Sequence, residues 1–233
     1  DFTYDITQPY QEVTHHLGKL SYYRRFEGFG KWTTQYDFQQ NRRFEYDIRV
    51  GDDADKASLD LKLTTHSVLT NIKFDAKEGF DLKVGALGRY QTNFANPDTG
   101  VRRLIPDYDK YDFGLFAIGS YELNKDWTLD AGARYDFSRI DSKKFYRVSR
   151  WEERGYDVDF ADIIIEDLGT QLLVNPVFDY HNFSGTAGFH YELNDKDHLR
   201  FNYAYSQRAP NPSELFSDGL HHSAARIELG DLR

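Results

Sequence analysis

The chain has 233 residues, a formal net charge of −9 and 16% aromatic residues, and it contains neither cysteine nor methionine. The acidic charge argues against nucleic-acid binding, which needs basic patches. The lack of cysteine excludes disulfides and cysteine-based metal sites. No apolar run approaches 18 residues, so we expect no membrane-spanning helix. Membrane β-barrels remain compatible with this composition, because their strands show only alternation with a period of two.

Alternation of apolar and polar residues predicts strands along the whole chain. In 126–138, for example, Leu129 and Ala131 alternate with Asp130 and Arg134. Such alternation indicates strands with one apolar and one polar face, and it persists too long for helices. We therefore expect antiparallel β structure with almost no helix. The predicted strands lie at about 12–26, 31–48, 58–74, 80–94, 111–123, 126–138, 183–193, 197–207 and 224–230.

The predicted links between strands alternate in length. Short links lie near 27–30, 76–79, 124–125 and 194–196, and longer ones near 49–57, 95–110, 141–182 and 208–223. Outer-membrane barrels have short periplasmic turns and long extracellular loops, so this alternation favours a transmembrane barrel over a sandwich. In such a barrel we expect the face of Leu129, Ala131 and Ala133 to contact lipid. The face of Asp130 and Arg134 should line the lumen.

One hairpin sequence occurs twice. The tetrapeptide YELN begins at Tyr121 and again at Tyr191, and each copy precedes an alternating segment. Together with Trp127, these tyrosines flank short turns, where an aromatic girdle belongs in a membrane barrel. The alternative is that any antiparallel meander repeats its turn chemistry, because turn residues come from a small set.

The predicted strands are too few for a complete large barrel. The chain supplies about nine or ten, whereas bacterial barrels have even strand counts and large ligand-gated transporters use about 22. We therefore expect residues 1–233 to be one partial barrel domain. The start at DFTYDITQPY, without methionine, indicates that the natural N-terminus lies elsewhere.

A resemblance to a known family rests on both ends of the chain. Residues 203–231, YAYSQRAPNPSELFSDGLHHSAARIELGD, and residues 15–47, HHLGKLSYYRRFEGFGKWTTQYDFQQNRRFEYD, resemble segments of TonB-dependent outer-membrane receptors. The ELFxxGxH pattern is closest to the branch linked to zinc uptake. The matching residues near the C-terminal end are Ser206, Arg208, Ala209, Pro210, Glu214, Leu215, Phe216, Glu228 and Gly230.

This resemblance implies an all-β fold, with these residues forming part of a 22-stranded barrel whose plug and TonB-contacting box are absent from the 233 residues. The implied function is TonB-energised uptake of a scarce nutrient across the bacterial outer membrane: a metal ion, an iron–siderophore chelate or haem. Implied partners are lipid, an extracellular small ligand and the TonB complex. No resident cofactor is implied, since zinc or an iron chelate would be cargo.

Other function classes stay open at this stage. The sequence lacks GxSxG, HExxH, GxxxxGK[ST] and GxGxxG, so we expect no enzyme activity. The alternatives are a passive porin-like or structural barrel, or a soluble β-rich binding domain. The sequence N-terminal to Asp1 would discriminate, because a plug domain selects the energised receptor.

Four residues after the predicted strand 197–207 are candidate metal ligands, because imidazole and carboxylate suit zinc. The alternative is a polar loop with incidental histidines, since no fixed ligand spacing is present. The four candidates are Glu214, Asp218, His221 and His222.

Three further residues are candidate contacts for an extracellular ligand. Arg102 and Arg103 could hold an anionic chelate, because guanidinium groups pair bidentately with carboxylate or phosphate. An ordinary exposed pair is the alternative. Trp151 belongs to the basic and aromatic part of the 141–182 link. That link exceeds the usual loop length, so we expect it to fold partly over the barrel mouth and to help capture ligand; the alternative is a mobile loop.

Overall fold

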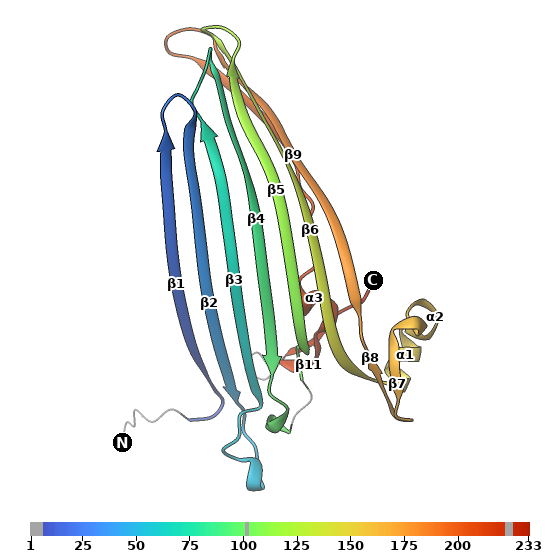
Figure 1. Ribbon diagram of the computed structural model, residues 1–233. Helices are drawn as coiled ribbons and strands as arrows, with labels where there is room; N and C mark the ends of the chain where they lie inside the picture. Colours follow the sequence, from blue (N-terminus) through green and yellow to red (C-terminus); the bar gives the residue numbers. More distant parts are fainter. Residues whose placement is uncertain (1–6, 101–102, 222–225) are drawn as a thin grey trace.

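The computed structural model describes residues 7–100, 103–221 and 226–233. Its main element is a ten-stranded antiparallel sheet in which β1 to β6 lie side by side in chain order, followed by β9 and β10 (Figure 1). Over the described residues the sheet is open and not closed into a barrel. Its long strands are β1 Tyr10–Phe26, β2 Gly30–Tyr46, β3 Leu59–Phe74, β4 Phe80–Ala95, β5 Asp107–Glu122, β6 Trp127–Arg147, β9 Val177–Glu192 and β10 His198–Tyr205.

The remaining elements are short and lie toward the long-loop end of the sheet. They are the strands β7 Ile164–Asp167, β8 Gln171–Val174, β11 Asp218–His221 and β12 Arg226–Leu229, the helices α1 Val148–Glu153, α2 Tyr156–Asp159 and α3 Pro212–Phe216, and the 3-10 turns η1 Gly51–Asp53, η2 Pro97–Thr99 and η3 Ala161–Ile163. Among the described residues, none of the helices has the length and apolar character needed to cross a membrane.

The register gives the sheet two chemically different faces. Directly opposite residues of antiparallel strands point to the same side, so Arg134 shares a face with Phe116 and Ser184, whereas Ala133 shares the other with Ala117. We call the Arg134 side the inner face and the Ala133 side the outer face. The expected division of 126–138 into a polar and an apolar face is therefore present.

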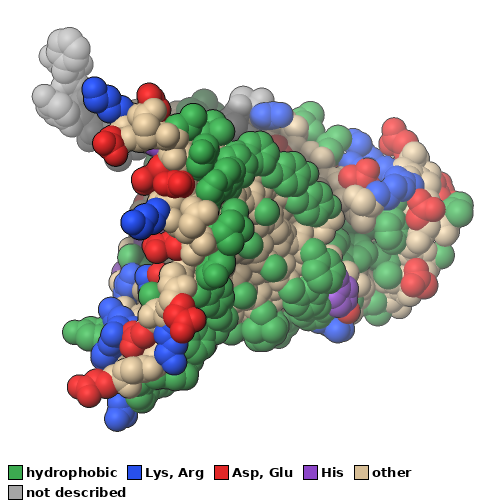
Figure 2. Space-filling model, turned by 90° about the horizontal axis from the view of Figure 1, so that it is seen from above, with side chains coloured by type: hydrophobic (Ala, Val, Ile, Leu, Met, Phe, Trp, Pro, Cys, Tyr) green, Lys and Arg blue, Asp and Glu red, His purple; other side chains and the backbone are tan. Residues whose placement is uncertain are grey.

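The outer face carries large apolar side chains that the described protein leaves uncovered. Leu115 is 47% exposed and Phe201 is 54% exposed. Such a continuous apolar surface is unusual for a soluble protein and fits contact with lipid. In Figure 2, hydrophobic side chains occupy the centre of the view, and charged ones gather toward its two sides.

Aromatic pairs form two rows on the outer face. Near the short turns, the Trp127 and Tyr191 rings stack with centroids 4.3 Å apart. Further along the strands, Tyr90 lies 5.0 Å from Tyr111. The register places Tyr111 opposite Arg139, twelve residues along β6 from Trp127, which is about 40 Å along a strand and about 30 Å of height at barrel tilt. That height is close to the apolar band of about 25 Å in outer-membrane barrels.

The two YELN turns have the same hydrogen bonds. The Asn124 side chain accepts from the backbone N–H groups of Asp126 and Trp127, and the Asn194 side chain accepts from those of Lys196 and Asp197. An asparagine that holds its own turn in this way fixes the hairpin register. The repeated sequence thus marks two equivalent short turns, of β5–β6 and β9–β10.

The 141–182 link is shorter than predicted, because β6 continues to Arg147 and β9 already begins at Val177. Between them, residues 164–174 form the β7–β8 hairpin. β8 pairs with residues 144–147 of β6, along the same edge that β9 follows from 141 onward.

The largest buried cluster lies at this end of the sheet. Helices α1 and α2, the ends of β6 and β8, and the C-terminal segment all contribute to it. Its buried members are Ile140, Tyr146, Trp151, Tyr156, Leu172, Val174, Leu215, Phe216 and Leu232.

Candidate functional site

The segment after β10 is held by an arginine–glutamate clamp. Arg208 donates two parallel hydrogen bonds to Glu214, of 2.8 and 2.7 Å. The same carboxylate accepts from the backbone N–H of Asn211 at 2.8 Å, which completes a capping box at the start of α3. Bidentate guanidinium–carboxylate pairs have a fixed geometry. The clamp therefore sets the direction in which the chain leaves the strand.

The prolines of this segment explain why the strand ends before the clamp. Pro210 and Pro212 have no N–H to donate to a ladder, so regular pairing cannot continue through them. Pro212 instead occupies the first turn of α3, where a missing N–H costs nothing. α3 then buries Leu215 and Phe216 in the cluster at the long-loop end.

The charge state of Glu214 follows from the clamp. Hydrogen bonding to Arg208, and then to the Asn211 backbone, lowers the pKa of the Glu214 carboxyl to about 2. The carboxylate is thus fully ionised at neutral pH and engaged by three donors.

Helix α1 places Trp151 inside the cluster. Its side chain is 1% exposed and its ring lies 5.3 Å from Tyr146 and 5.2 Å from Tyr156. The indole Nε1 has no hydrogen-bond partner among the described groups. In this arrangement the indole supports the loop from within and does not reach solvent, so direct ligand contact by Trp151 stays a prediction.

Tyr156 connects the long loop to the end of the chain. Its hydroxyl donates to the Asp231 carboxylate at 2.8 Å and accepts from the Leu232 backbone N–H at 3.0 Å. Nearby, Arg233 donates to Asp159. Two segments that are far apart in sequence are thus joined through one buried phenol.

Lys144 forms a second connection between the sheet and the C-terminal segment. It lies on the inner face of β6, donates to the Phe216 carbonyl, and has its Nζ 3.7 Å from the Asp218 carboxylate. Both side chains are nearly fully buried. A buried charge is tolerated only when it is paired and hydrogen-bonded, so Asp218 serves here as the partner of Lys144.

Of the four candidate metal ligands, only Glu214 and Asp218 have described side chains, and each of these is engaged by another residue. Glu214 is bound by Arg208, and Asp218 lies beside Lys144. His222 lies outside the described residues, and of His221 only the backbone, in β11, is described. Among the residues that are described, no group of three His, Asp or Glu side chains could hold a metal ion. A metal site built on the two histidines stays a prediction.

Arg103 lies at the outer face. Its guanidinium donates to Asp107 at 2.8 Å, and Asp107 stands directly opposite Lys143 on the outer side of β5 and β6. Arg102 lies outside the described residues. The anionic partner predicted for this pair would therefore meet Arg103 on the outside of the sheet. Binding of an extracellular chelate by the pair stays a prediction.

The inner face is mainly polar. Asp112 accepts from Arg89 and from the Ser138 hydroxyl, at 2.8 and 2.7 Å. Further along, Arg134 binds Asp136 with two bonds of 2.6 Å. A wall of paired charges and hydroxyls can face water or a polar plug, and this is the surface expected inside a transport barrel.

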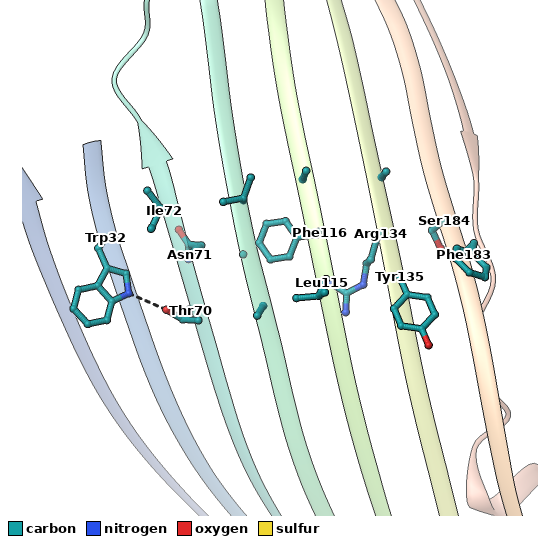
Figure 3. A pocket seen from close by; sticks show the side chains of 15 residues that line it. Trp32, Thr70, Asn71, Ile72, Leu115, Phe116, Arg134, Tyr135, Phe183 and Ser184 are labelled. Atoms are coloured by element: carbon teal, nitrogen blue, oxygen red, sulfur yellow. Dashed lines mark hydrogen bonds between the residues drawn. The ribbon is translucent and has the colours of Figure 1, made fainter. Parts of the chain in front are cut away.

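Figure 3 shows a shallow depression on the sheet with a volume of about 630 Å³. It lies between the two aromatic rows and is lined mainly by apolar outer-face residues from β2 to β9, among them Ile72, Leu115 and Phe183. Trp32 at its edge donates to the Thr70 hydroxyl at 2.8 Å. Because this surface is apolar, it suits acyl chains better than a polar nutrient.

Comparison with known proteins decides the family. The model of the family "TonB dependent receptor-like, beta-barrel" matches residues 1–233, the whole chain. The chain belongs to this family. The resemblance seen in the two terminal segments is thereby confirmed for the entire length of this TonB-dependent receptor barrel. No curated protein sequence matches it.

Solved structures of the same kind share the fold at low sequence identity. The ferric-catecholate import receptor Fiu from E. coli K12 is 15% identical with a TM-score of 0.62, covering 88% of this chain and 37% of Fiu. The copper transporter OprC is 13% identical (TM-score 0.65, covering 89% and 34%). HasR of Serratia marcescens, solved with its hemophore HasA and heme, is 17% identical (TM-score 0.64, covering 95% and 34%). This receptor barrel therefore spans about a third of each of those chains.

Sequence reasoning missed Tyr156 and Lys144, the two residues that join the receptor's loop to its C-terminal segment. Their partners lie more than 70 positions away. Local patterns cannot specify such contacts. One signal was available for Lys144, because the alternation of β6, extended past 138, places it on the inner face.

Proposed function

We propose that this chain is the barrel portion of an outer-membrane receptor that takes up a scarce nutrient with energy delivered through TonB. The nutrient is a metal ion, an iron–siderophore chelate or haem. The family supports the receptor class, and the two-faced sheet is the observation that carries the proposal. An uncovered apolar outer face suits lipid, while a polar inner face suits a water-filled or plugged lumen.

The folded long loop supports a receptor rather than a simple pore. It is joined to the C-terminal segment through Tyr156 and contributes the buried Trp151. An ordered structure at the long-loop end can present a defined surface to an extracellular ligand. The proteins of similar fold carry ferric catecholates, copper and heme, and these three cargo classes set the first choices for this receptor.

Uptake in whole cells tests the proposal. The intact receptor is expressed in cells with and without a functional TonB, and accumulation of radiolabelled zinc, copper, ferric catecholate and haem is measured. The proposal expects accumulation of one cargo only when TonB is functional. Equal accumulation without TonB would identify a passive barrel instead, and failure to fractionate with the outer membrane would favour a soluble binding domain.

A further inference from the structure

Two histidines meet on the inner face at the short-turn end of the sheet. His190 of β9 is on the same face as Ser184, and His198 of β10 stands opposite Glu192, the next inner-face residue of β9. The two histidines are therefore diagonal neighbours across the β9–β10 pair. Side chains at such diagonal positions are close enough for aromatic rings to touch.

The spacing of the two rings fits one shared metal ion. The ring centres of His190 and His198 lie 5.5 Å apart, and the ring planes are inclined by 77°. Two imidazoles that bind one tetrahedral zinc ion at about 2.1 Å have ring centres about 5.2 Å apart. A square-planar ion holds neighbouring ligands at right angles and would bring the centres to about 4.5 Å. The observed spacing therefore favours tetrahedral zinc over copper(II) or nickel(II).

Both imidazoles have nitrogens available for a ligand. Among the described residues, neither His190 nor His198 has a hydrogen-bond partner. Other histidines of the sheet differ in this respect. On the outer face, the Nδ1 atoms of His66 and His181 are each hydrogen-bonded to a tyrosine hydroxyl, at 2.8 and 2.7 Å. A neutral imidazole nitrogen without a partner is the most common metal ligand in proteins.

The surroundings of the pair supply a carboxylate. Glu192 stands directly opposite His198, and it has no ion-pair partner in the part of the chain that is described. Its side chain is not placed as a third ligand in this structure, since no group of three such residues is found among those described. It can reach the ion by turning about its side-chain bonds, because opposite residues have Cβ atoms about 4.5–5.5 Å apart. Arg200, the cation opposite His190, lines a neighbouring hollow together with Asp130.

We propose that His190 and His198 bind a zinc ion on the inner face at the short-turn end, with Glu192 and water completing the tetrahedron. In outer-membrane barrels the inner face lines the lumen, and the short turns lie at the periplasmic end. The site is therefore separate from the candidate metal ligands that follow β10, which lie toward the long-loop end. The place of the site on the path of a zinc cargo rests on the proposed function, whereas zinc binding itself does not.

Metal binding to the purified intact receptor tests the site. Cobalt(II) is the probe, because it occupies zinc sites and absorbs visible light strongly only in tetrahedral coordination; zinc is then added to displace it. The double variant His190→Gln/His198→Gln should bind one tetrahedral cobalt ion fewer per chain than the wild type. Each single variant should bind this ion about 100-fold more weakly, because the second imidazole of a chelating pair acts at a high effective concentration.

The matched control is His66→Gln/His181→Gln, which removes two histidines that are held by tyrosine hydroxyls on the outer face and should bind cobalt as the wild type does. Glu192→His adds a third imidazole beside the pair and should tighten binding about tenfold, so it serves if the double variant fails to fold. Wild-type binding by the double variant, or unchanged affinity in Glu192→His, would overturn the site. Loss of an octahedral cobalt spectrum alone would overturn the tetrahedral geometry and with it the assignment to zinc.

Zinc accumulation in whole cells separates the site from the proposed function. TonB-dependent accumulation of radiolabelled zinc should be slower in His190→Gln/His198→Gln than in the control variant. Equal accumulation in the two variants would remove the site from the cargo path. TonB-independent uptake by the wild type would refute the proposed function alone, since metal binding is measured on purified receptor.

Discussion

The hydroxyl of Tyr156 is the single group whose removal should loosen the long loop from the C-terminal segment. The Tyr156 ring is fully buried, and its oxygen accepts from the Leu232 N–H at 3.0 Å. Substitution by phenylalanine keeps the ring packing against Trp151 and Phe160. The change therefore isolates the hydrogen bonds from the hydrophobic contacts.

The magnitude follows from the groups left behind. Tyr156→Phe leaves the buried Leu232 N–H without an acceptor, which costs about 1–3 kcal/mol. Asp231 loses the Tyr156 donor but keeps the Arg233 backbone N–H at 3.1 Å, and it is exposed enough to bind water, so it adds little. Arg154 still donates to the Gly230 carbonyl, and Arg233 still donates to Asp159, so the segment stays docked. Local opening should become about 5- to 150-fold more frequent.

Hydrogen exchange of the intact receptor in lipid nanodiscs measures this opening directly. Amides in 148–159 and 226–233 should exchange faster by that factor, while those of β1 to β4 keep their wild-type rates. Tyr203→Phe is the control, because Tyr203 is 63% exposed on the outer face. Unchanged exchange in 226–233, or an equal acceleration in the Tyr203 variant, would refute the role assigned to the buried hydroxyl.

Three further changes test other parts of the molecule. Ala131→Arg places a charge on the lipid face, which costs about 2–4 kcal/mol. The folded fraction, measured by heat-modifiable gel mobility, should therefore be lower for Ala131→Arg than for Asp130→Ala. Equal folded fractions for the two variants would count against a membrane barrel. Because the pKa of Glu214 is lowered from 4.5 to about 2 in the folded state, the stabilisation from its clamp is complete above pH 4.5 and lost as pH falls through about 2. Pepsin cleavage at 206–217 should therefore rise across that window in the wild type. In Glu214→Gln, cleavage should already be high at pH 4.5 and should not rise further as the pH falls. Cleavage that depends on pH in the same way in both proteins would contradict the role of the clamp. Deleting Arg150–Val174 in the intact receptor should leave the barrel inserted but weaken nutrient uptake. Unchanged uptake would remove the loop from ligand capture, and failed assembly would make it a structural element.

Period-two alternation predicted the long strands well where one face of the sheet is apolar and the other is polar. It failed at the long-loop ends of β6 and β9. In residues 139–147 the alternation of apolar and polar residues is lost. The outer side is mostly charged there, while the inner side mixes the buried Ile140 and Tyr146 with Ser142 and Lys144. At the start of β9 the usual sense is reversed, since the inner-face Phe178 and Tyr180 pack against the buried cluster while Asp179 faces outward.

The candidate site was harder to predict than the fold. The sequence motif around Arg208 and Glu214 supports the family resemblance, and in the structure the carboxylate proposed as a metal ligand is bound by Arg208. Trp151 was selected for its surroundings in sequence, and the structure places it inside the cluster. The contacts of Trp151 are tertiary, whereas those of Glu214 are local but depend on how the chain turns after β10. Residue type alone does not specify either set of contacts.

The shared edge of β6 has a consequence for the order of assembly. β5 and β6 are joined by the short 123–126 turn, whereas 148–176 separates β6 from β9; closing the longer link costs about 2 kcal/mol more in chain entropy. β8 reduces this cost, because it pairs with residues 144–147 and ends only two residues before β9 begins on the same edge. Once β8 is paired with β6, β9 can add its hydrogen bonds to β6 one after another without closing a further long loop. The insert therefore sets the register of the slowest junction in the sheet, and its loss should delay folding even where the finished barrel is equally stable.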